Sequence, residues 1–278
     1  MVNYIIDKNN CAPCQLKQNK NKKFKSCYSK DSLIKIAELW NKNNSLNKIK
    51  IENASREKLW TQIQKNLNMV CKKDEYCWKK QEFIKKLKNI DIEMYTFKPE
   101  YPKAWYKNDH TWLNTYDIYY VMKQYEKTYD DFIFLGPVPS DCPTNIQCEL
   151  SKLDLTTMKK NGINKIGIVY NLDTSAGNGS HWVAIYIDNK NNEINYYDSY
   201  ASKPTRLIHK FIKTLVDKYN SKVIYNDKRH QYGGSECGMF SMNFILERLH
   251  GATMYDISQT DLPDKNMTHL RKLLFNYS

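Results

Sequence analysis

The first hundred residues carry apolar side chains at helical spacing. The segment DSLIKIAELWNK begins at Asp31 and places four of them on one helical face: Leu33, Ile36, Ala37 and Trp40. Asp31 or Ser32 suits the start of this helix, because a short polar side chain accepts hydrogen bonds from first-turn N–H groups. Segments at about 55–68 and 74–89 show the same spacing. Residues 1–30 are polar and lysine-rich without a clear period, so we expect a loop or an extended arm there.

The pattern changes near residue 100. The stretch MYTFKPEYPKAWYKN, with two prolines and many aromatic residues, is typical of a connection. Helices are predicted in TWLNTYDIYYVMKQYEKTY, at about 204–219 and after Cys237. Strands are predicted in DDFIFLGPVP, stopped by Gly136 and Pro137, and in NKIGIVYNLD, HWVAIYID, EINYYDSY and KVIYN. This alternation predicts a mixed sheet packed by helices, hence an α+β domain over 101–278 after a mainly helical, basic arm domain over 1–100.

The positive charge is concentrated in the predicted arm. The chain of 278 residues has a formal charge of +13, and residues 1–100 carry 22 Lys and Arg against 11 Asp and Glu, while residues 101–278 carry 21 against 19. A basic region of this kind suits nucleic acid, an anionic membrane surface or an acidic partner. A solvated lysine surface is the alternative.

Hydropathy and cysteine usage indicate the compartment. No run approaches the roughly 18 apolar residues that span a bilayer, and the N-terminus lacks an apolar signal core. We therefore expect no membrane span and a cytosolic or nuclear-type compartment, where eight cysteines favour free thiols over a disulfide framework. Cys11, Cys14 and Cys27 offer three zinc ligands, but a fourth at a convincing spacing is missing. Structural zinc is thus an alternative, and we expect no metal and no cofactor.

Cys237 is the first candidate for chemistry. It follows two glycines in GGSECGMFSMNFILERL and directly precedes a strongly apolar helical pattern. Unpaired N–H groups and the helix dipole favour an anion in the first turn, and a thiolate is such an anion. The placement predicts a nucleophile, and a small buried hydrophobe is the alternative.

A thiolate needs a base and a group that orients the base. The strands HWVAIYID and EINYYDS are joined by the polar segment NKNN, which suits a hairpin. If the turn centres near residue 190, paired residue numbers sum to about 380, which brings His181 and Asp198 together at the open end. Asp198 then holds the His181 imidazole while its other nitrogen faces the nucleophile. Asn195, on the same strand as Asp198, is the alternative orienting residue.

Gln231 precedes Cys237 by six residues, across a glycine-containing loop. Its amide and the backbone N–H of Cys237 form the donor pair that an acyl-transfer site needs for a developing oxyanion. A solvated loop glutamine is the alternative.

The order His181-Trp182, Asp198, Gln231, Cys237-Gly238, with gaps of 17, 33 and 6 between the four polar residues, resembles the ubiquitin-like-protein-specific cysteine proteases. That clan includes SUMO proteases and the adenovirus protease, and the similarity is greatest to polyprotein-processing proteases of large cytoplasmic DNA viruses. The resemblance implies a papain-like or adenain-like α+β fold with a buried helix that carries the nucleophile. It implies that His181 is the general base, Asp198 its orienting partner and Gln231 an oxyanion donor.

The family also has a tryptophan in a WLN motif and another directly after the catalytic histidine, which here match Trp112 and Trp182. The resemblance implies that these indoles, with Gly238, shape a narrow groove for Gly-Gly before the scissile bond. SUMO proteases usually continue WLN with aspartate, where this chain has Thr115. This departure bears on recognition of a ubiquitin-like partner and not on a Gly-Gly peptide.

The combined prediction is a cysteine endopeptidase that cleaves after Gly-Gly-type sites and processes viral structural polyproteins during virion maturation. Its expected location is the host cytoplasm and the virion. One alternative is an enzyme that removes SUMO or another ubiquitin-like modifier, and another is acetyl transfer by the same triad. An alternative of a different class is a basic nucleic-acid-binding module, which is also compatible with protease activity.

Overall fold

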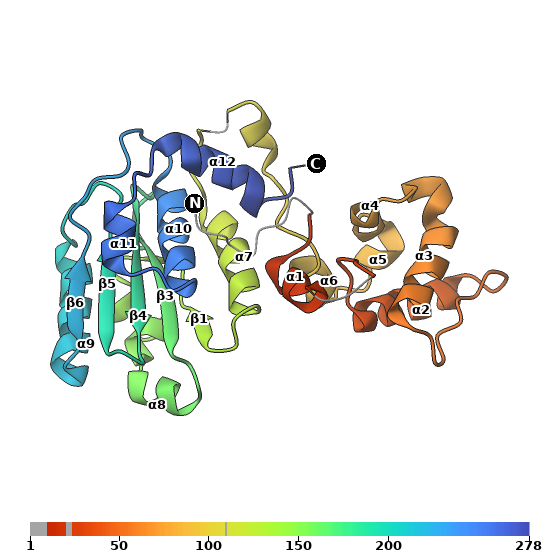
Figure 1. The fold of residues 1–278 in the computed structure, drawn as a ribbon, viewed down its shortest axis with the longest axis horizontal. Helices are drawn as coiled ribbons and strands as arrows, with labels where there is room; N and C mark the ends of the chain where they lie inside the picture. The colour runs from red at the N-terminus through yellow and green to blue at the C-terminus, as the bar shows by residue number, and fades with distance from the viewer. Residues whose placement is uncertain (1–9, 21–23, 109, 278) are drawn as a thin grey trace. The chain divides into compact units, whose positions relative to one another are not determined.

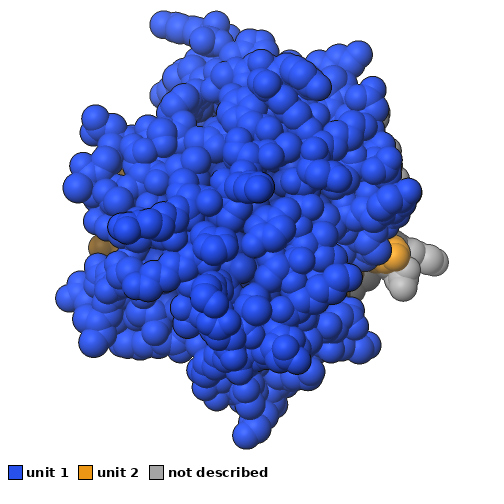
Figure 2. Space-filling model, turned by 90° about the vertical axis from the view of Figure 1, so that its left-hand side faces the viewer, with its two compact units in different colours: residues 1–4, 101–274 blue, residues 5–100, 275–278 orange. Residues whose placement is uncertain are grey.

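The structure is a computed structural model that describes residues 10–20, 24–108 and 110–277. The chain divides into two compact units, shown in different colours in Figure 2. The larger unit contains Tyr101–Leu274, and the smaller contains the described residues up to Glu100 together with the chain end from Phe275. The chain end belongs to the smaller unit because the N–H of Asn276 donates to the carbonyl of Pro99, 2.8 Å away. The predicted second domain, by contrast, ran to residue 278.

The smaller unit is helical (Figure 1). Its helices are α1 (Pro13–Asn19), α2 (Lys30–Asn43), α3 (Arg56–Cys71), α4 (Glu75–Lys79), α5 (Glu82–Lys85) and α6 (Ile90–Met94). The Ser29 hydroxyl accepts from the N–H of Ser32, so α2 begins one residue before the predicted Asp31. The predicted helix at 74–89 is two short helices, α4 and α5.

The expectation of a loop over residues 1–30 is wrong for the described part, because α1 forms there. Residues 1–9 and 21–23 lie outside the described residues. Pro13 stands at the first helical position, where its missing N–H costs no hydrogen bond, and Cys14 and Gln15 are buried. Lysine-rich composition around α1 concealed this short helix.

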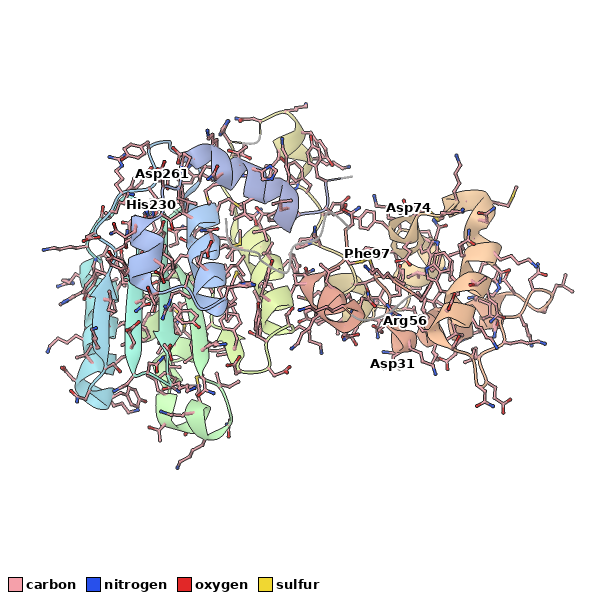
Figure 3. The ribbon with its side chains drawn as sticks, viewed as in Figure 1. Asp31, Arg56, Asp74, Phe97, His230 and Asp261 are labelled. Carbon is pink, nitrogen blue, oxygen red and sulfur yellow. A yellow bond between two sulfur atoms is a disulfide. The ribbon has the colours of Figure 1, made fainter. Side chains whose placement is uncertain are left out.

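Aromatic packing and one arginine organise the core of the smaller unit. Tyr28 stacks on Trp78 with centroids 5.6 Å apart and meets Phe97 edge to face. Arg56, labelled with Phe97 in Figure 3, donates from Nε to the carbonyl of Tyr28 at 2.8 Å and from Nη2 to that of Ser26 at 2.7 Å. These bonds hold the chain before α2 against α3.

The expectation of free thiols is wrong for six cysteines. They form three disulfides, Cys11–Cys27, Cys71–Cys77 and Cys142–Cys148, while Cys14 and Cys237 are not part of a disulfide. The expectation of thiols rested on the compartment alone, which does not show which cysteines are neighbours. The fold brings these six residues into close pairs. Zinc at Cys11, Cys14 and Cys27 loses two ligands to the first disulfide. Among the described residues, no group of three or more His, Cys, Asp or Glu is arranged to hold a metal ion.

The larger unit is built on one mixed sheet with strand order β1-β3-β4-β5-β6 (Figure 1). The strands are β1 (Phe132–Phe134), β2 (Val138–Pro139), β3 (Lys165–Asn171), β4 (Trp182–Asp188), β5 (Glu193–Tyr197) and β6 (Lys222–Tyr225). Strand β4 pairs antiparallel with β3 on one side and with β5 on the other. Strands β1 and β2 pair in parallel with β3, and β6 pairs in parallel with β5. The predicted mixed sheet and α+β class are confirmed.

Side chains alternate along each strand, so apolar residues point to both faces of the sheet. A helix packs on each face. Helix α9 (Arg206–Tyr219) packs on the face that includes Ile168, Ile185 and Tyr196. Helix α10 (Cys237–Leu249) packs on the opposite face, where Phe244 stacks on Tyr197 with centroids 4.7 Å apart. Nearly every residue of α10 is buried. This central helix starts at the candidate nucleophile.

Shorter elements complete the larger unit. They are η1 (Lys103–Tyr106), α7 (Thr115–Glu126), η2 (Cys142–Thr144), η3 (Glu149–Lys152), α8 (Leu155–Lys160), α11 (Met254–Gln259) and α12 (Asp264–Leu274). The predicted helix in TWLNTYDIYYVMKQYEKTY is α7, which Asn114 and Asp117 begin with a reciprocal capping box. Helices α8, α11 and α12 were not predicted.

Candidate active site

Cys237 is the first residue of α10, and its side chain is buried. Glu236 precedes it in a non-helical conformation, so the N–H groups of the first turn have no partner within the helix. The predicted position at the first helical turn is therefore confirmed. The positive end of the helix dipole stabilises a thiolate there.

The hairpin brings His181 and Asp198 together, in a register slightly different from the predicted one. Strand β4 pairs with β5 through Ala184↔Tyr197 to Asp188↔Glu193. Continuing this register places Val183 opposite Asp198, with His181 two residues farther along. The side chains nevertheless meet, with His181 Nε2 2.7 Å from Asp198 Oδ1. Asn195, the alternative orienting residue, lies within the strand opposite Tyr186.

The histidine also contacts the candidate nucleophile. Burial alone lowers the pKa of His181, but hydrogen bonds to Asp198 and Cys237 outweigh it and raise that pKa to about 9. Because Nε2 is bonded to Asp198, Nδ1 is the ring nitrogen left for the thiol. With its pKa raised to about 9, the His181 imidazole is protonated at neutral pH.

A buried carboxylate needs partners, and Asp198, 1% exposed, has several. Its Oδ1 accepts from His181 and from the backbone N–H of Tyr200 at 2.9 Å. The backbone of Asp198 is held by Asn226, whose Oδ1 accepts from the Asp198 N–H at 2.9 Å and whose Nδ2 donates to its carbonyl at 2.7 Å. These bonds fix the carboxylate at the end of β5.

Gln231 is fully buried in the loop before Cys237. Its Oε1 accepts from the Ser199 hydroxyl at 2.6 Å. Its Nε2 donates to the carbonyl of Gly233 at 2.9 Å and to the hydroxyl of Tyr200 at 3.2 Å. Both amide hydrogens thus have acceptors within the protein, so an oxyanion must displace one of them.

The two tryptophans differ in exposure. Trp112 is 51% exposed, and its Nε1 donates to the carbonyl of Gly234, three residues before Cys237, at 2.8 Å. Trp182 is 6% exposed, and its Nε1 donates to the carbonyl of Leu113 at 3.0 Å. A β-carbon added at Gly238 meets Leu113 Cδ1 at 2.9 Å and Trp182 Cδ1 at 3.2 Å. The surroundings of the nucleophile are therefore tightly packed on the Trp182 side.

Helix α12 holds the loop that precedes the nucleophile. Arg271 Nε donates to Glu236 Oε2 at 3.0 Å, with both side chains almost fully buried, and the guanidinium lies over the Trp105 ring. Asp264 Oδ2, at the start of α12, accepts from the N–H of Gly233 at 2.8 Å. These contacts of α12 were not predicted from the sequence, because the contacting residues lie some 30 positions apart and form no motif.

Comparison with known proteins identifies the family. Residues 170–277 match the Ulp1 protease family, C-terminal catalytic domain. The chain is 30% identical to a putative thiol protease of Acanthamoeba polyphaga mimivirus over 289 aligned residues, which cover 96% of this chain and 93% of the relative. This chain belongs to the Ulp1 protease family. It is a cysteine-type peptidase of the viral branch that resembles SUMO proteases, as the sequence predicted.

Other relatives of this Ulp1-family chain are also viral. A cysteine protease of African swine fever virus is 31% identical over 125 residues, which cover 42% of this chain and 45% of the relative. A crystal structure of the protease from that virus superposes with a TM-score of 0.64 at 20% identity, covering 99% of this chain and 98% of the other. That similarity shows that the two proteins share a fold over nearly the whole of this chain. No helix in the described part of the chain has the length and apolar character needed to cross a bilayer.

Proposed function

We propose that this Ulp1-family protein is an endopeptidase that cleaves after Gly-Gly-type sequences, with Cys237 as nucleophile and His181 as its base. The observation that carries the proposal is the 2.7 Å contact between His181 Nε2 and Asp198 Oδ1, which orients the imidazole, together with Cys237 at the start of α10, whose influence helps to raise the pKa of His181. This arrangement supplies a nucleophile, a proton carrier and an orienting carboxylate in one place.

The proposed reaction proceeds through an acyl-enzyme. The Cys237 thiolate attacks the glycine carbonyl carbon, and the protonated His181 then gives its proton to the departing amine as the C–N bond breaks. Water, deprotonated by His181, hydrolyses the thioester and releases the carboxylate product. Gln231 Nε2 and the N–H of Cys237 donate to the oxyanion at each tetrahedral stage.

The packing around the nucleophile supports a preference for small residues. Trp182 is buried against Leu113 and Gly238, as expected for a floor, and the half-exposed Trp112 is held beside the loop before Cys237, as expected for a roof. A slot between rigid indoles widens only at a cost, because over-packing costs about 1–3 kcal/mol even in cores. We therefore propose glycine at both positions before the scissile bond.

The viral relatives support a role in processing structural polyproteins during virion maturation, with the enzyme in the host cytoplasm and in the virion. A panel of Gly-Gly-X and Gly-Leu-X peptides tests the activity, with and without a thiol-blocking reagent. The proposal predicts cleavage after Gly-Gly that the block abolishes. Equal cleavage of the leucine peptides contradicts the narrow groove.

Removal of a ubiquitin-like modifier is a second candidate function. One African swine fever virus relative, 30% identical over 42% of this chain, carries the name SUMO-1 cysteine protease. In this chain Thr115 follows the WLN motif and is the first residue of α7. Cleavage of a SUMO C-terminal reporter at the rate found for Gly-Gly-X peptides favours this candidate, and a much slower rate favours the polyprotein substrate.

Nucleic-acid contact by the basic N-terminal region is a further proposal, which can coexist with proteolysis. It is supported by the 22 Lys and Arg against 11 Asp and Glu in residues 1–100. Binding of the full chain to duplex DNA at increasing salt concentration tests it. Affinity that falls steeply with salt supports the proposal, and no binding at low salt contradicts it.

A further inference from the structure

Tyr200 lies directly against the candidate base. Its ring stacks on the imidazole of His181, with centroids 4.8 Å apart and planes 23° apart. Its backbone N–H donates to Asp198 Oδ1 at 2.9 Å, and the same oxygen accepts from His181. One carboxylate oxygen thus holds both residues, and the ring covers a face of the imidazole.

The hydroxyl of the same tyrosine reaches the oxyanion loop. It donates to the carbonyl of Gly233 at 2.9 Å and accepts from Gln231 Nε2 at 3.2 Å. The bond from the Ser199 hydroxyl to Gln231 Oε1 orients the amide, so its NH2 group faces Gly233 and Tyr200. Tyr200 is therefore bonded to Gln231 and stacked on His181 at the same time.

The charges around Tyr200 favour the protonated phenol. Burial raises the pKa of the Tyr200 hydroxyl, and the neighbouring Cys237 thiolate raises it further. Asp264 and Asp198 act in the same direction, whereas Arg229, which lies 5.0 Å over the ring, acts against them. The hydroxyl therefore keeps its proton at neutral pH and donates it to Gly233.

We propose that Tyr200 is a positioning residue for the cleavage reaction, whose ring holds the plane of His181 and whose hydroxyl holds the Gln231 amide in place for the oxyanion. The ring also excludes water from one face of the imidazolium–thiolate pair, which strengthens their attraction. When substrate binds, its carbonyl oxygen replaces one acceptor of the amide, which is already oriented. This role rests on the proposed function, because it concerns the same reaction.

Tyr200→Phe and Tyr200→Leu in the full chain separate the two roles. Phenylalanine keeps the ring and loses the hydroxyl, so kcat on a Gly-Gly-X peptide should fall about 3- to 10-fold, as expected for one hydrogen bond, with KM within twofold. The pH profile of iodoacetamide alkylation at Cys237 should not move. Leucine also loses the ring, so its acid limb should shift to higher pH as water weakens the ion pair.

A double-mutant cycle with Gln231→Ala tests whether the hydroxyl acts through the amide. Tyr200→Phe should cause no further loss of kcat in the Gln231→Ala background. The same fold-loss in both backgrounds overturns the link between the two residues. Tyr232→Phe is the matched control, because its ring also lies beneath Arg229, at 4.9 Å, but is 74% exposed; wild-type kcat is expected.

The two readouts also separate this inference from the proposed function. Absence of cleavage by the wild-type chain contradicts the proposed function, while alkylation of Cys237 still reports on Tyr200. A wild-type alkylation profile in Tyr200→Leu overturns the role of the ring. A change below twofold in kcat for Tyr200→Phe, in a chain that cleaves the peptide, overturns the role of the hydroxyl.

Discussion

Arg271→Met tests how the nucleophile is held in place. The substitution removes the cation from a pair in which Arg271 is 0% and Glu236 2% exposed, and leaves a buried carboxylate directly before Cys237. Removal of one partner of a buried pair costs about 3–5 kcal/mol, because the remaining charge loses its compensation. For a unit of this size we expect the melting temperature to fall by about 6–20 °C. His110 Nδ1, 3.5 Å from Glu236, is too exposed to replace the guanidinium.

The matched variants locate the cause. Glu236→Gln/Arg271→Met removes both charges, so most of the lost stability should return. Lys213→Met breaks an exposed pair with Asp217, whose side chains are 66% and 61% exposed, and should cost less than about 1 kcal/mol.

Thermal unfolding and hydrogen exchange of the α10 amides measure these effects. The exchange data assign the loss to the unit that contains α10 and α12. A melting temperature of Arg271→Met within 2 °C of the wild type would show that the Arg271–Glu236 pair does not stabilise the loop before Cys237. A double variant less stable than the single one would contradict the same role.

The remaining predictions concern the reaction. Cys237→Ser should lower peptide cleavage on the order of 10³-fold or more with little change in stability, and retention of a tenth of the rate would exclude this thiol as nucleophile. His181→Ala should abolish turnover and Asp198→Asn should reduce it less, because the imidazole remains; the reverse order in kcat contradicts their roles. The rate should fall as pH rises through about 9, where His181 loses the proton needed by the leaving amine, and Asp198→Asn should move this limb to lower pH. The pKa of His181 is also higher in the folded chain than its ordinary value of 6.5, so protonation of His181 favours the folded state. This contribution to the free energy of unfolding is complete below pH 6.5 and is lost as pH rises through about 9, which unfolding measured at several pH values tests. Gly238→Ala should impair folding or activity, because its β-carbon meets Leu113 at 2.9 Å; wild-type activity and melting temperature would contradict that packing.

The elements that position the site were largely predictable from the sequence. Strands β3 and β4 contain continuous apolar runs, β5 alternates polar and apolar residues before two tyrosines, and the short polar turn between β4 and β5 sets which of their residues are neighbours. That arithmetic brought His181 to Asp198, although the register differs by about one residue. The side chains still meet because both residues lie beyond the last β4–β5 pair, where the ladder no longer sets which side chains face each other.

Contacts between distant segments were not predictable from local pattern. The Glu236–Arg271 pair and the hydroxyl contacts of Tyr200 depend on where α12 and the loop before α10 lie in space. A tyrosine after Asp198 or an arginine in an amphipathic helix has the same local pattern whether it is solvated or buried. The disulfides were missed for a related reason, since Cys71 and Cys77 face each other only once α3 has ended and α4 has begun.

In the proposed reaction, Cys237 attacks the carbonyl carbon of the second glycine of a Gly-Gly site. An electrophilic peptide ending in Gly-Gly, with a vinyl ester in place of the scissile bond, tests this by mass spectrometry of the labelled full chain. We expect one adduct on Cys237, none in His181→Ala, and much slower labelling when leucine replaces either glycine. An adduct on Cys14, the other thiol outside the disulfides, or equal labelling by the leucine peptide, would exclude this reaction.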